Sequence, residues 1–273
     1  MHLLGVDFTS APSPRKPIVA VWAYWEKPGV VCLHTLQRFS DWSGFETLLQ
    51  TPGPWVAAMD FPLSLPRALL QALGWPTEWS AAVEHIQQLG KSGFESALIA
   101  YQQAQPQGQK FVYRPTDRLT RSSSPMKLHY PPVGKMFFQG AIRLKAAGVC
   151  IPKLADNPDP RVVVEAYPAL IARRLLKKAP YKQDNPKQQT IERFQARQSA
   201  LTQLQRQVLL PEFGFSIHLA PALEKALLED ATGDTLDACF CAIQAAWASQ
   251  TEHWGIPPIP EAEDGWIVDP ALL

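Results

Sequence analysis

The chain has 273 residues and a formal net charge of +1, with 46% hydrophobic and 19% charged residues. This composition is typical of a folded globular protein and excludes a disordered or fibrous one. No apolar run reaches the roughly 18 residues that a membrane-spanning helix needs. The first residues lack the basic leader of a signal peptide, and the four cysteines include no CxxC pair, so we expect a cytoplasmic protein.

The first half of the chain is predicted to begin with three strands. These are "HLLGVDF", which is an apolar run, "PIVAVWAYW", which is β-branched and aromatic, and "GVVCLHTLQRF" after the turn "EKPG". "DWSGFETLLQ" follows as a short helix with Asp41 as its N-cap. "PWVAAMDFP" is a continuous apolar run closed by Pro62, which is typical of a buried central strand.

The rest of the chain is predicted to be mostly helical. We expect helices near 66–74, 77–89 and 93–104, a loop rich in Pro, Ser and Arg over 105–133, and a helix near 135–147. "RVVVEAYP" indicates a fifth strand, the helix "ALIARRLLKK" follows it, and "APYKQDNPKQ" is a polar linker. The next helix carries an apolar stripe of Ile191, Phe194, Leu201, Leu204 and Val208. The last helix lies within "GDTLDACFCAIQAAW", and "GWIVDP" could add a short edge strand.

This order of elements predicts an α/β fold with a mixed five-stranded sheet flanked by helices. We expect one domain over residues 1–273, with a helical and basic insertion after the fourth strand, at about 66–150.

Acidic residues occur where burial is expected. Asp7 ends the first apolar run, Asp60 ends the fourth and Glu165 nearly ends the fifth. Asp234 and Asp237 lie three residues apart, and therefore on one face, at the start of an apolar helix. A helix N-cap or a salt bridge to an arginine is the ordinary explanation for any single one of these acids.

Together the acids favour a metal site. If the first and fourth strands are parallel neighbours, Asp7 and Asp60 lie at one sheet edge, and the last helix brings Asp234 and Asp237 to them. Crowded carboxylates repel unless a divalent cation holds them. Hard oxygen ligands favour Mg²⁺ or Mn²⁺ over zinc.

Four motifs carry a resemblance: "GVDF", "AMDFPLSLP", "VEAYPALI" and "GDTLDACFCAIQAAWA". With them the chain resembles an uncharacterised family of predicted nucleases with an RNase H-like fold. In related nucleases of that fold, notably the Holliday-junction resolvases, an aspartate on the first strand, an acid on the fourth and a D-x-x-D pair on the last helix bind two magnesium ions. The resemblance implies that the catalytic and metal-binding residues are Asp7, Asp60, Asp234 and Asp237. Glu165 matches the family's fifth-strand motif and is included among the metal ligands.

The expected activity is therefore two-metal-ion hydrolysis of a phosphodiester, with nucleic acid or a nucleotide as substrate. Two basic segments, Arg114–Lys135 and Arg173–Lys187, could bind its phosphates. The candidate residues are Arg114, Arg118, Arg121, Lys127, Lys135, Arg173, Arg174 and Lys182. Tyr113, His129 and Tyr130 are candidates to stack on bases.

Two other interpretations stay open. The chain could be a phosphoryl-transfer or ATP-binding protein of the actin- and sugar-kinase-like superfamily, because "GVDFTS" is similar to its first phosphate-binding turn. That superfamily normally needs a domain repeat and a glycine-rich nucleotide motif, and this chain has neither. The chain could also be a non-catalytic nucleic-acid-binding protein that keeps the acids as a structural ion site. DNA, RNA and small nucleotides remain alternatives as substrates, and the oligomeric state is open.

Overall fold

The structure, a computed structural model, describes residues 1–273 apart from the side chain of Pro186. The strands are β1 (His2–Asp7), β2 (Ile18–Lys27), β3 (Val30–Phe39), β4 (Trp55–Met59), β5 (Arg161–Glu165) and β6 (Ser216–Leu219). The helices are α1 (Trp42–Leu49), α2 (Arg67–Ala72), α3 (Trp79–Ala104), α4 (Pro115–Thr120), α5 (Val133–Ala147), α6 (Ala169–Leu176), α7 (Ile191–Gln205), α8 (Leu210–Phe213), α9 (Pro221–Glu229) and α10 (Asp234–Gln250). Short 3₁₀ turns lie at Pro186–Gln188, Glu252–Gly255, Pro260–Asp264 and Pro270–Leu272.

The described strands form one mixed six-stranded sheet in the order β5-β4-β1-β2-β3-β6. β1, β4 and β5 are parallel to one another, whereas β2 pairs antiparallel with both β1 and β3. The predicted α/β class and the parallel pairing of the first and fourth strands are confirmed. The predicted number of five strands is wrong, because the four-residue β6 adds an edge strand beside β3. The "GWIVDP" segment contributes only an isolated bridge between Ile267 and Glu165.

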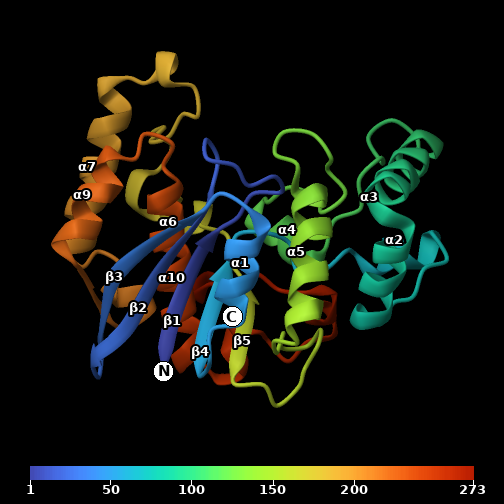
Figure 1. Cartoon of the computed structure of the whole chain (residues 1–273), viewed down its shortest axis with the longest axis horizontal. Helices are drawn as coiled ribbons and strands as arrows, with labels where there is room; N and C mark the ends of the chain where they lie inside the picture. Colours follow the sequence, from blue (N-terminus) through green and yellow to red (C-terminus); the bar gives the residue numbers. More distant parts are fainter.

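Helices cover both faces of the sheet, and the strands alternate between two buried clusters. Leu3, Val19 and Val56 pack with α6, α7, α9 and α10 on one face. Leu4 and Ala57 pack with α1, α2, α3 and α5 on the other face. Figure 1 shows α7 and α9 at one end of the molecule and α2 and α3 at the opposite end.

Helix α10 lies directly against the middle of the sheet, where it contacts β1, β2 and β4. A Cβ atom on Gly5 would be 2.1 Å from the carbonyl oxygen of Ala238 and 2.1 Å from the amide nitrogen of Ala242. Only glycine permits so close a contact between strand and helix. This contact brings the start of α10 to the end of β1. Every residue from Asp234 to Ala248 is buried, as the sequence predicted.

The two helices expected at 77–89 and 93–104 are confirmed as the two parts of α3, which non-helical backbone at Gly90 divides. Two local predictions need correction. The expected loop 105–133 contains α4. The α7 stripe is only partly buried, because Ile191 and Phe194 remain exposed while Ala196 and Ala200 lie in the core. None of the described helices is long and apolar enough to span a membrane.

Candidate acidic site in a basic cleft

Asp7 and Asp60 lie side by side at the carboxyl ends of two parallel strands. Val6 pairs with Met59 in the β1–β4 register, and the Asp60 amide donates to the Val6 carbonyl over 2.9 Å. Asp7 follows Leu3 and Gly5 in the alternation of β1, and Asp60 follows Val56 and Ala58, so both point to the α10 face.

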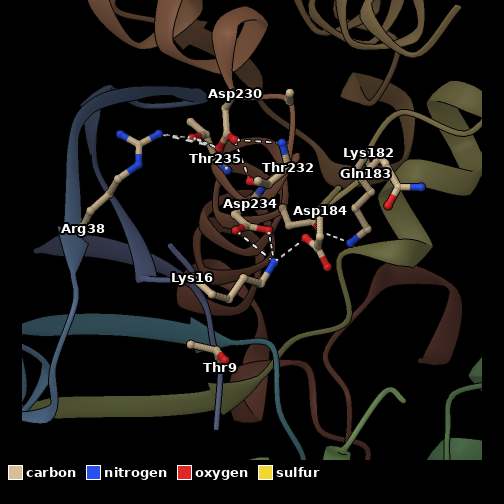
Figure 2. A network of polar contacts seen from close by, with 12 residues as sticks. Thr9, Lys16, Arg38, Lys182, Gln183, Asp184, Asp230, Thr232, Asp234 and Thr235 are labelled. Carbon is tan, nitrogen blue, oxygen red and sulfur yellow. Dashed lines mark hydrogen bonds and ion pairs between the residues drawn. The ribbon is translucent and has the colours of Figure 1, made fainter. Parts of the chain in front are cut away.

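The first turn of α10 places Asp234 and Asp237 on the same face. Asp230 anchors this turn, because its carboxylate accepts the Thr235 amide over 2.8 Å and the Thr235 hydroxyl over 2.5 Å. Arg38 of β3 donates to the same hydroxyl over 2.8 Å. Figure 2 shows this network beside Asp234.

Two lysines pair with the two helix aspartates. Lys16, from the β1–β2 connection, donates to both Asp234 oxygens over 2.8 and 3.0 Å, and also to Asp184 over 3.0 Å (Figure 2). Lys182 donates to Oδ2 of Asp237. The Tyr181 hydroxyl donates to Oδ1 of Asp237 over 2.6 Å. Both oxygens of each helix aspartate are therefore engaged.

The strand aspartates have no such partner. The carboxylates of Asp7 and Asp60 accept no hydrogen bond from any described side chain or backbone group, although both are half-buried. Burial, with the negative charges of Asp234, Asp237 and Asp60, raises the pKa of Asp7 well above its usual value. Burial and the charge of Asp237 raise the pKa of Asp60 to about 7, although Lys182 opposes the shift. The four carboxylates are thus close enough to repel one another.

Glu165 differs from this group because an arginine pairs with it, although its charge also raises the pKa of Asp60. In β5, Val162 and Val164 face α10, so Glu165 points to the other face of the sheet. There its two oxygens accept from Arg114 over 2.6 Å each, and the Leu63 amide donates to Oε2 over 2.9 Å. Glu165, which the resemblance included among the metal ligands, is therefore paired with an arginine in this structure, and it also lines the cleft described below.

A cleft of about 640 Å³ opens above the strand aspartates. The acidic side chains that line it are Asp7, Asp60, Asp117, Glu165, Asp184 and Asp234, whereas Asp237 does not line it and is 0% exposed. The walls come from the β1–β2 connection, the loop before α5, helix α6 and the linker after α6. The positive side chains that line this cleft are Lys16, Arg114, Arg173, Lys177, Lys178 and Lys182.

The predicted phosphate-binding residues fall into three groups. Arg173 and Lys182 line the cleft, as a phosphate-binding role requires. Arg118, Arg121, Lys127 and Lys135 lie outside its lining, and Lys135 is 3.9 Å from Glu95.

Arg114 and Arg174 form the third group and need correction, because their guanidinium groups are used inside the protein. Arg114 is 1% exposed, and its N–H groups donate to Asp117, Glu165 and Ser64. Arg174 donates to Asp269 over 2.6 Å and to Glu212 over 2.6 Å.

Sequence reasoning missed Lys16, Lys177 and Lys178. Lys177 and Lys178 lie in the basic segment that the sequence singled out, so charge alone could have included them. Lys16 offered no such signal, because its partner Asp234 is 218 residues away in the chain.

The donor set is suited to a divalent cation, although not with all four aspartates at once. Within the described part of the chain, no group of three or more His, Cys, Asp or Glu side chains is arranged to hold an ion as it stands. Lysines occupy Asp234 and Asp237. Asp7 and Asp60 remain as unpaired hard oxygen donors that face the cleft, and such donors fit Mg²⁺ or Mn²⁺.

The fold and this cleft define an α/β protein with an acidic cluster at the carboxyl edge of a mixed sheet. Residues 5–262 match the model of a family described as "Protein of unknown function (DUF429)", and the chain belongs to this family. No curated protein and no solved structure matches the chain.

Proposed function

We propose that the protein is a metal-dependent phosphodiester hydrolase of RNase H-like fold that acts on nucleic acid. The observation that carries the proposal is the pair of unpartnered carboxylates, Asp7 and Asp60, at the floor of a cleft with lysines and an arginine on its walls. A phosphodiester needs cations around its phosphate and a cation-bound water for attack, and these residues are suited to both requirements.

Each part of the cleft has a role in this proposal. Asp7 and Asp60 would hold a divalent ion, which when bound supplies charge stabilisation and an activated water. Lys177 and Lys178 are exposed at the end of α6 and make no ion pair with any described residue, so they are free to bind phosphates on either side of the scissile bond. Arg173 donates to the Thr120 carbonyl over 2.7 Å, which holds its guanidinium at the wall.

The test is a hydrolysis panel with the purified full chain and Mg²⁺ or Mn²⁺. It contains single-stranded and structured DNA and RNA, mononucleotides, ATP and bis-p-nitrophenyl phosphate, with Asp60→Asn as the inactive variant and Lys225→Met on α9 as a matched surface control. We expect cleavage by the wild type and by the control, and none by Asp60→Asn. Consumption of ATP without cleavage of any phosphodiester would favour the phosphoryl-transfer alternative.

A further inference from the structure

The number of ions that the cleft can hold follows from which carboxylates are free. Asp237 has one oxygen on the Tyr181 hydroxyl and the other on Lys182, and it does not line the cleft. Asp234 has both oxygens on Lys16. Of these four aspartates, only Asp7 and Asp60 are left to receive an ion from the cleft.

The charges agree with this geometry. Lys182 compensates the charge of Asp237, and Lys16 pairs with Asp234 and also with Asp184. Once Asp7 and Asp60 have lost their protons to a bound cation, their two negative charges match the charge of one divalent ion. The Lys182 ammonium also acts electrostatically on Asp7 and Asp60, in addition to its contact with Asp237. It therefore lies within the acidic cluster, where a second cation would otherwise compensate the repulsion.

We propose that the cleft binds one divalent ion, held by Asp7 and Asp60, and that the ammonium of Lys182 replaces a second ion. This inference rests on the proposed function for the kind of ion, and it departs from the two ions that the resemblance implies. Lys182 is a positioning residue here: it holds Asp237 and presents one positive charge to the phosphate that the ion also contacts. Its side chain is 48% exposed and lines the cleft.

The experiment counts ions. The full chain is freed of metal with EDTA, exchanged into chelator-free buffer and titrated with Mn²⁺, and free Mn²⁺ is measured by electron paramagnetic resonance. We expect one bound ion for the wild type and two for Lys182→Met, in which Asp237 loses its ammonium. Lys178→Met is the matched control, because Lys178 lines the same cleft without an ion pair, and it should keep one ion.

Two bound ions in the wild type, or a count of one in a folded Lys182→Met protein, would overturn the inference. If Lys182→Met does not fold, Lys16→Met serves instead, because it frees Asp234 in the same way. The hydrolysis panel on the same samples separates the two proposals. One ion without cleavage supports the ion count and contradicts the hydrolase, whereas two ions with cleavage contradict only the ion count.

Discussion

Arg114 and Glu165 form a buried ion pair with two N–O distances of 2.6 Å, on the sheet face opposite the four aspartates. Asp117 adds a second carboxylate to the same guanidinium, at 2.7 Å. The pair joins α4, inside the segment predicted to be a loop, to the end of β5. Its place in the fold is therefore structural.

Replacing Arg114 by Met should lower the free energy of unfolding by about 3–5 kcal/mol, because two buried carboxylates would lose their partner. Arg118→Met is the matched control, since Arg118 is exposed, lies over the ring of Tyr113 and makes no ion pair with any described residue. Urea unfolding of both variants measures the difference. Equal stability of the two variants would contradict the structural role.

The acidic pair on the strands was predictable from the sequence, and Glu165 shows why the rest was not. Asp7 and Asp60 each end an apolar run, and parallel pairing of those runs puts them together. Glu165 also ends such a run, but its orientation depends on the alternation relative to β4, and the register that pairs it with Met59 is set by tertiary structure. A shift of one residue would have put it among the aspartates.

Two further misses have similar causes. β6 is only four residues long and lies at an edge, so its apolar signal is weak, and it forms because the chain returns to β3. Arginines are rarely buried without partners, so sequence charge favoured a surface role for Arg114, whose partner Glu165 is 51 residues away.

The exposed lysines of the cleft should control how nucleic-acid binding depends on salt. Replacing Lys177 and Lys178 by Glu reverses their charges and leaves two phosphates without a cation. Each lost phosphate contact should reduce the slope of log affinity against log salt by about 0.7 for a single strand. Fluorescence anisotropy with a labelled oligonucleotide in EDTA, at a series of salt concentrations, measures this slope. The double variant Arg118→Glu, Arg121→Glu changes two residues of α4 and its C-terminal end. Both lie outside the cleft lining, so this variant should leave the slope unchanged. If the slope instead fell in the Arg118→Glu, Arg121→Glu variant and not in the lysine variant, the nucleic-acid-binding surface would lie at α4.

Tyr130 should stack on a base of a single-stranded substrate. It lines the same cleft as Lys177 and Lys178 and is 86% exposed, so its ring is available to a bound strand. Tyr130→Ala should weaken binding of a single strand by about 5- to 150-fold, because one base–aromatic stack is worth about 1–3 kcal/mol. Tyr130→Phe should bind like the wild type. Tyr113→Ala is the control outside the cleft lining, and an abasic oligonucleotide should not distinguish Tyr130→Ala from the wild type. Weaker binding of the abasic strand by Tyr130→Ala would exclude stacking.

Stability without metal should decrease as pH rises. The pKa of Asp60 is raised to about 7 from 3.8, so the folded protein binds this proton more tightly than the unfolded chain does. The group's contribution to the free energy of unfolding therefore falls between about pH 4 and about pH 7. Asp7 acts in the same direction, because its pKa is also raised.

Asp60→Asn should remove this contribution. In thermal unfolding with EDTA from about pH 5 to about pH 8, the variant should lose less stability than the wild type and should unfold at the higher temperature at the upper end. Parallel curves for the two proteins would mean that Asp60 is ionised throughout the range and is not crowded by other charges.

The assignment of the ion to Asp7 rather than to Glu165 gives the last prediction. A ligand at about 100 times its Kd stabilises the folded state by about 2.7 kcal/mol, so Mn²⁺ should raise the unfolding temperature of the wild type. Asp7→Asn removes one of the two unpaired carboxylates, and the Mn²⁺-induced rise should largely vanish. Without metal the variant should be more stable than the wild type near neutral pH, because a repelled charge is gone.

Glu165→Gln provides the matched comparison, since it makes the same chemical change on the opposite face of the sheet. It should be less stable than the wild type in EDTA, because Arg114 loses a charged partner. Its Mn²⁺-induced rise should nevertheless equal that of the wild type, because Glu165 contributes no ligand. A rise that disappears in Glu165→Gln and persists in Asp7→Asn would reverse the assignment, and the ion would then belong to the arginine side of the sheet.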